Sequence, residues 1–239
     1  MSEVAVFREE MGSAPRARWK ADLPKCCSGK NSVKICVLSE TLFAPGDSPF
    51  QAKGTVWLGI RMFVENHVPG GVETVGKALE PRFRDFFSQI FVAAGWYDIL
   101  PIITISKTIG AVMGLEQMEY VRRSATWHAE LDMSNVYKGL GQLPSPQSVC
   151  LRFASIHSRF YSFGKVEILE VGTNHVVSEL DSMPAILAPW WQTAAEWYLF
   201  MILKAAGAKN GRITFLPTRP NGSQAGLDLV YVPARTVWD

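Results

Sequence analysis

The chain has 239 residues, of which 48% are hydrophobic and 19% are charged, and its formal net charge is +2. This length suits one large domain or two small ones and is sufficient to bury a substantial core. The near-neutral charge gives no reason to expect a nucleic acid partner, and the absence of a charge-free run of about 18 apolar residues argues against a membrane span.

Residues 1–31 are polar and irregular, so we expect a flexible leader there. Residues 32–239 are expected to form a single domain, beginning with a short strand or helix at about 32–43. The four cysteines form no disulfide framework or zinc-ligand pattern, and the N-terminus lacks the apolar segment of a signal peptide. A cytoplasmic location follows from these features.

From about residue 53 to residue 161 the apolar residues recur at helical spacing. Gly and Pro residues punctuate this part, and Asp98 is placed to cap the helix that follows it. A short helix or turn is expected at about 132–140. The longer predicted helices cover about residues 53–66, 72–79, 81–91, 99–113, 116–131 and 148–161.

The pattern changes from helical to alternating in the last part, about residues 165–233. Residues 165–171 and 175–180 flank a Gly-Thr-Asn turn and predict a β-hairpin. Residues 212–218 and 226–232 flank a polar loop and predict a second hairpin. The fold class is therefore α+β, a helical N-terminal part followed by a small antiparallel sheet in the order strand-strand-helix-strand-strand.

Between the two predicted hairpins lies a helix, residues 183–206, which contains three of the eight tryptophans. It is apolar most of the way round, so it should be covered on several sides and should pack on the sheet. Gly207 follows at the position where a helix commonly ends. A pocket for an apolar ligand is expected along this helix.

No motif for covalent or metal chemistry is present. The four histidines are dispersed, without an HExxH spacing, and no GxSxG sequence occurs. Cys150 lies seven residues before His157, too far for direct contact, and is expected to be a buried thiol. A non-enzymatic protein is favoured, although an enzyme acting on an apolar substrate with Asp98 or His157 as base stays open.

The candidate binding site combines polar residues on the helix before the first hairpin with aromatic residues of the tryptophan-rich helix. Arg152 belongs to the same polar group. An apolar cavity with a polar mouth is the usual form of a small-molecule site; the alternative is that these aromatic side chains only fill the core. The predicted ligand-binding residues are Trp190, Trp191, Trp197, Tyr198, His157, Arg159 and Tyr161.

Four short segments carry a resemblance to known proteins: Lys53-Gly54, Phe63-Val64, Gly95-Trp96-Tyr97-Asp98 and Tyr161-Ser162-Phe163-Gly164. They resemble an uncharacterised family of bacterial paralogues. The hairpin-helix-hairpin ending is similar to the NO-signalling and Golgi-transport ligand-binding superfamily, with its haem-NO-binding, vinyl-reductase-like and TRAPP small-subunit members. Over residues 53–232, the resemblance implies a sensory or small-molecule-binding domain, or alternatively a protein–protein interaction module such as a homodimer.

The haem-binding members of that superfamily carry a Tyr-x-Ser-x-Arg motif that holds the haem propionates. The corresponding segment here, residues 176–180, retains only Ser178, and Glu179 would repel a propionate. His157 is the one candidate for the proximal histidine that the resemblance implies. We therefore expect no cofactor, disfavour haem, and predict a small apolar ligand.

Overall fold

The structure, a computed structural model, describes residues 43–134 and 145–239. They belong to one compact unit, Ser39–Asp239. The predicted leader at 1–31, nearly all of the element expected at 32–43, and most of the turn expected at 132–140 lie outside the described residues.

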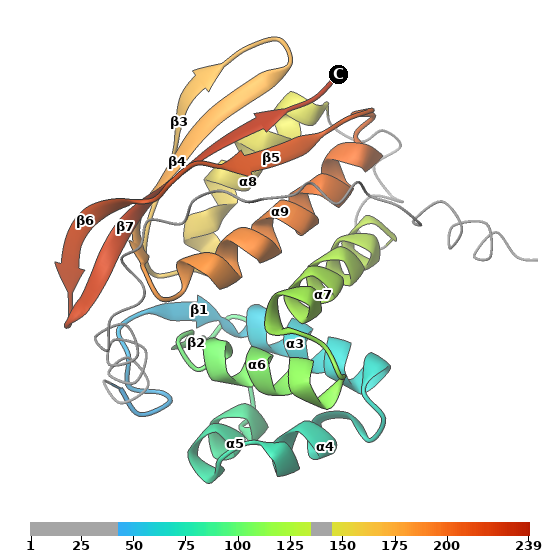
Figure 1. Cartoon of the computed structure of the whole chain (residues 1–239), viewed down its shortest axis with the longest axis vertical. Helices are drawn as coiled ribbons and strands as arrows, with labels where there is room; N and C mark the ends of the chain where they lie inside the picture. The colour runs from blue at the N-terminus through green and yellow to red at the C-terminus, as the bar shows by residue number, and fades with distance from the viewer. Residues whose placement is uncertain (1–42, 135–144) are drawn as a thin grey trace, which may run out of the picture. The chain divides into compact units, whose positions relative to one another are not determined.

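The helical part agrees with the predicted order of helices (Figure 1). Each helix differs from its predicted range by only a few residues. Pro81 lies in the first turn of its helix, where the missing N–H is not needed. The helices are α3 (Gly54–His67), α4 (Gly71–Ala78), α5 (Pro81–Ser88), α6 (Ile102–Val112), α7 (Gln117–Asp132) and α8 (Pro146–Phe160).

Two short strands, β1 (Gln51–Lys53) and β2 (Trp96–Asp98), form an antiparallel pair that the sequence did not predict. Three-residue strands are too short to show an alternating pattern. The predicted helix-capping role of Asp98 is wrong, because α6 begins only at Ile102. The buried Asp98 carboxylate instead accepts hydrogen bonds from the backbone of Gly46, Ser48 and Leu100 and from the Ser48 hydroxyl.

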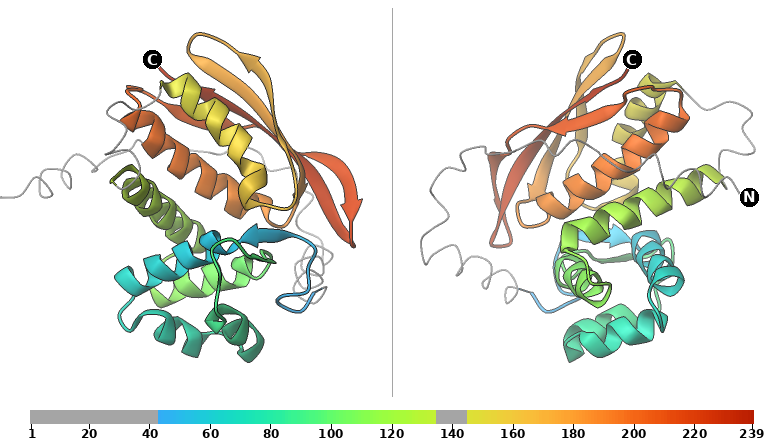
Figure 2. Two further views of the ribbon diagram at one scale, coloured as in Figure 1. Left: turned by 180° about the vertical axis from the view of Figure 1, so that it is seen from behind. Right: turned by 45° about the vertical axis from the view of Figure 1, so that its right-hand side comes forward.

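The C-terminal part is a five-stranded antiparallel sheet with β3, β4, β7 and β5 in that order and β6 paired with β7. Helices α8 and α9 lie on one face of it (Figure 2). The α+β class predicted from the sequence is confirmed. The elements are β3 (Val166–Val171), β4 (His175–Pro184), α9 (Ala188–Ala205), β5 (Arg212–Phe215), β6 (Arg219–Gln224) and β7 (Leu227–Val237).

Strand β6 occupies the stretch that was expected to be a polar loop. Ala225 and Gly226 both have positive φ, 51° and 83°, and form the two-residue turn that joins β6 to β7. Positive φ at both central positions is typical of the type I′ hairpin turn. Pro220 is tolerated because β6 pairs on one side only, as an edge strand. The ending therefore contains one strand more than predicted.

Helix α9 begins at Ala188, five residues later than predicted. Met183 and Pro184 instead complete β4, where they pair with Val230 and Leu229 of β7. As expected, α9 is covered on several sides, since it packs against β5, α7 and α8. No helix in the described ranges has the length and apolar character needed to cross a membrane.

Candidate functional site

Four helices, α3, α7, α8 and α9, line a cavity of about 580 Å³ that opens to the surface. Its wall is mostly apolar, with Leu58 and Met62 from α3 and Trp190 and Trp191 from α9 among the larger side chains. Pockets that bind small molecules typically measure roughly 300–1,000 Å³ and are lined mainly by apolar and aromatic groups with a few polar ones. The cavity has the size and lining of such a pocket.

Five of the seven predicted binding residues line this cavity, namely His157, Tyr161, Trp190, Trp191 and Tyr198. They belong to α8, to α9 and to the segment that follows α8. Whether these residues contact a ligand stays a prediction.

The other two predicted residues, Trp197 and Arg159, do not line the cavity. Trp197 packs under the Arg122 guanidinium, 4.9 Å from its ring centroid, and against Phe200. It shares a helix face with Trp190, but seven residues advance an α-helix by about 10.5 Å. At Trp197 the side chain contacts Arg122 on the surface of α7 and does not reach the cavity. Arg159 lies in an adjoining groove.

His128 of α7 lines the cavity with a defined tautomer. Its Nδ1 lies 3.0 Å from the Ser124 carbonyl oxygen, which can only accept, so Nδ1 carries the proton. Burial lowers the pKa of His128, with the Asp132 carboxylate acting in the opposite direction, so the ring is neutral at pH 7. The lone pair of Nε2 is then available, and no described residue donates a hydrogen bond to it.

A glycine on α3 makes room for this ring. A Cβ atom on Gly59 would lie 2.7 Å from His128 Nε2. Contacts this short do not occur, so any side chain at position 59 would displace the imidazole or close the space in front of its free nitrogen. Gly59 thus lets the α3 backbone pack closely against the His128 ring where α3 and α7 meet.

His157 of α8 contributes a second neutral imidazole. Its Nε2 lies 3.1 Å from the Phe163 carbonyl oxygen, and its ring stacks on Tyr161 at 4.9 Å and meets Trp191 edge-on at 5.7 Å. Burial lowers the pKa of His157 to about 4. Because Nε2 holds the proton, the free nitrogen is Nδ1, which is the ring nitrogen nearer the backbone. The two imidazoles therefore leave different ring nitrogens unprotonated, Nε2 in His128 and Nδ1 in His157.

Asp132 is the one charged side chain among the described residues lining the cavity, and Tyr198 Oη donates to it at 2.8 Å. No three His, Cys, Asp or Glu side chains gather in the described ranges as a metal-binding group. Cys150 is buried, as predicted, and burial raises its pKa to about 11, which disfavours the thiolate.

Sequence patterns did not predict that His128, Gly59 and helix α3 line the cavity. A signal for the α7 wall was present, because Tyr120, Ser124 and His128 recur every four residues and therefore lie on one helix face. The partner wall on α3 had no such signal. Its cavity residues continue the same apolar pattern as its core residues.

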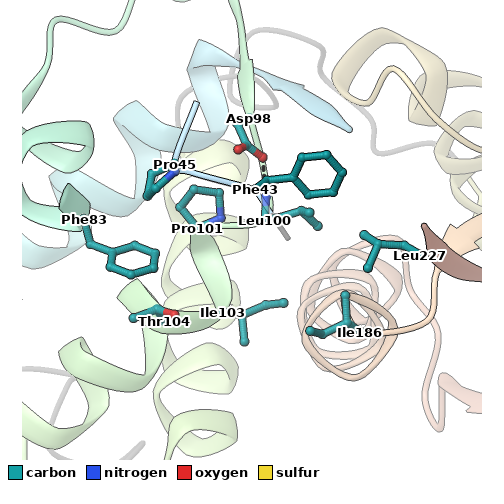
Figure 3. A pocket seen from close by; sticks show the side chains of 10 residues that line it. All are labelled: Phe43, Pro45, Phe83, Asp98, Leu100, Pro101, Ile103, Thr104, Ile186 and Leu227. Carbon is teal, nitrogen blue, oxygen red and sulfur yellow. Dashed lines mark hydrogen bonds between the residues drawn. The ribbon is translucent and has the colours of Figure 1, made fainter. Parts of the chain in front are cut away.

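A second cavity lies near β2 and α6 and is shown in Figure 3. Side chains of α6, including Ile103, face Ile186 and Leu227 across it, with Asp98 at one end (Figure 3). Its volume is about 40 Å³. Since a single water needs roughly 10–15 Å³, this space is sufficient for a few waters and too small for an organic ligand.

The arrangement of helices and sheet is similar to that of H-NOX structures, in agreement with the fold that the resemblance implied. The sequence matches no protein-family model and no curated protein. The fold similarity therefore comes from solved structures alone.

An oxygen-binding H-NOX domain related to soluble guanylate cyclases, in its oxygen complex, superposes with a TM-score of 0.52 at 9% identity, covering 78% of this chain and 92% of that one. An H-NOX protein from S. oneidensis in the Fe(II) ligation state gives 0.51 at 12% identity, covering 78% and 96%. A structure concerned with haem redox potential and porphyrin distortion gives 0.52 at 9%, covering 78% and 92%.

These similarities overturn the expectation that haem is disfavoured, because the fold is shared with haem-binding H-NOX domains. The residues around the cavity fit such a group. A metal-ligating histidine almost always donates its other ring N–H to a carbonyl or carboxylate, and both His128 and His157 do so. The missing Tyr-x-Ser-x-Arg residues were weak grounds for exclusion, since a short motif does not report on imidazoles contributed by other helices.

Proposed function

We propose that this chain is a non-enzymatic sensory domain that binds a small, largely apolar molecule in the cavity between α3, α7, α8 and α9. The observation that carries the proposal is a cavity of about 580 Å³ with a mostly apolar wall, to which His128 contributes a neutral imidazole. A few polar groups in an otherwise apolar pocket fix the orientation of a ligand.

Haem is the first ligand to test, given the fold that this chain shares with H-NOX domains. His128 would hold the iron through Nε2, which faces Gly59 of α3 in this structure, while the Ser124 carbonyl fixes the tautomer. Trp190 and Trp191 would pack against the macrocycle, and the apolar wall would exclude water from it. When bound, haem supplies an iron that can take up a diatomic gas.

Tryptophan fluorescence tests the proposal, because Trp190 and Trp191 line the cavity. The protein is purified and titrated with haemin and with dodecanol, and its visible spectrum is recorded with haemin. We expect both compounds to change the fluorescence. If neither does, the cavity does not bind ligands of this class and the proposal fails.

His128→Leu tests the ligation separately from cavity binding. We expect this variant to weaken haemin binding at least about tenfold and to alter the Soret band, with dodecanol binding unchanged. His175→Ala is the matched control, since His175 lies on the β3–β4 hairpin and does not line the cavity. Wild-type haemin affinity and spectrum in His128→Leu would refute the assignment of iron to His128.

A further inference from the structure

A groove of about 380 Å³ lies beside the cavity, between α8 and α9. It shares three lining residues with the cavity, namely Phe153, Ile156 and Tyr198. The two spaces are therefore neighbours. A ligand long enough to pass these side chains would have its body in the cavity and one end in the groove.

The groove differs from the cavity in charge. Arg152 and Arg159 line it, both are exposed, and they lie seven residues apart on α8, which is two helical turns or about 10.5 Å. No acidic side chain is among its described lining residues. Neither arginine forms an ion pair or a side-chain hydrogen bond with another described residue.

Two uncompensated guanidinium groups at the edge of an apolar space create a positive potential there. Each guanidinium also offers paired N–H donors that match a carboxylate. The alternative is that the arginines only cover apolar surface with their aliphatic stems, as long cationic side chains often do. In that alternative only the aliphatic stem of each arginine matters, and its charge has no role in binding.

We propose that the ligand of this domain is an anionic amphiphile, with its apolar body in the cavity and its carboxylate on Arg152 and Arg159 in the groove. This inference rests on the proposed function, because it requires a ligand in the cavity. A fatty acid and a carboxylate-bearing tetrapyrrole share this chemistry.

The charge is tested with two probes of equal chain length, dodecanoate and dodecanol, titrated against the full chain by tryptophan fluorescence. We expect dodecanoate to bind more tightly than dodecanol. Arg152→Gln and Arg159→Gln remove the charge while keeping a shorter aliphatic stem with a polar end. Each variant should weaken dodecanoate binding about two- to fivefold, the range for one exposed charge pair. Dodecanol affinity should stay the same in both variants.

Arg235→Gln is the matched control, since Arg235 is exposed on β7 and lines neither the cavity nor the groove. Raising the salt from 0.05 to 0.5 M should weaken dodecanoate binding in the wild type and much less in the double variant, because salt screens exposed charges. Unchanged thermal unfolding of the variants verifies that they fold.

A second pair of probes, haemin and its dimethyl ester, distinguishes a tetrapyrrole from a fatty acid. Preference for haemin over the ester that disappears in the double variant assigns the groove to tetrapyrrole carboxylates, and dodecanoate preference alone assigns it to fatty acids. If each acid binds as tightly as its neutral analogue, the anionic-amphiphile proposal is overturned while cavity binding stands. Failure of all four probes to bind would remove the proposed function as well.

Discussion

The buried imidazole of His157 makes the stability of this fold depend on pH. Burial lowers its pKa from an ordinary value of 6.5 to about 4, because the charged ring loses hydration that the Phe163 carbonyl and Asp181 only partly replace. Between these two values the unfolded chain binds a proton that the folded chain does not. Stability therefore rises with pH across this window and is lost as pH falls from about 6.5 to about 4.

The magnitude follows from the two pKa values. At 1.36 kcal/mol per pKa unit, the difference between 6.5 and about 4 corresponds to about 3 kcal/mol of unfolding free energy. His157 is only 4% exposed, so solvent screening does not reduce this figure much. The carboxylate of Glu119, whose pKa the hydrogen bond from Arg122 lowers to about 2, contributes its own loss mainly at more acidic pH.

Urea unfolding between pH 4 and pH 7 measures the effect. We expect His157→Gln, which keeps a donor for the Phe163 carbonyl but does not titrate, to show a shallower pH dependence by up to about 3 kcal/mol. Phe153→Leu is the control, because this substitution also removes a ring contact with Trp191, whereas Phe153 has no titratable group. It should lower stability equally at every pH.

Two outcomes would refute this reasoning. One is an identical pH dependence in wild type and His157→Gln. The other is a His157 pKa of 6.5 or higher in a direct NMR titration of the folded protein.

Three further substitutions test particular contacts. Gly54→Ala places a Cβ 2.0 Å from the Val92 carbonyl oxygen and should lower the unfolding free energy, measured by chemical unfolding, by about 1–3 kcal/mol or more. In Gly76→Ala the nearest contact is at 3.7 Å, so this control should be neutral or slightly stabilising. Asp98→Ala leaves several donors in the 46–48 loop and at Leu100 without their acceptor, and a loss of about 2–4 kcal/mol in thermal unfolding is expected; a loss below about 0.5 kcal/mol would contradict it. Ala194→Phe fills the cavity and should reduce dodecanol binding more than about tenfold with native circular dichroism; unchanged binding would show that dodecanol binds elsewhere.

The sequence alone determined the order and type of the longer elements. Apolar spacing identified α3 to α9 because each helix buries one face and so repeats every three to four residues. It missed β1, β2 and β6 for a related reason. The first two are three residues long, and β6 is a polar edge strand with most of its side chains exposed, so neither case produces alternation.

The cavity was predicted only in part because lining residues and core residues have the same composition. The sequence predicted cavity residues on α9 and, at the end of α8, His157 and Tyr161. It could not place α3 and α7 opposite them. His128 and Gly59 are 69 positions apart in the chain. Only the packing of α3 on α7 brings the unprotonated Nε2 of His128 next to the backbone of Gly59. The tautomer of that imidazole, the wall that it faces and the position of Trp197 away from it are consequences of tertiary packing, which a pattern within a single helix does not record.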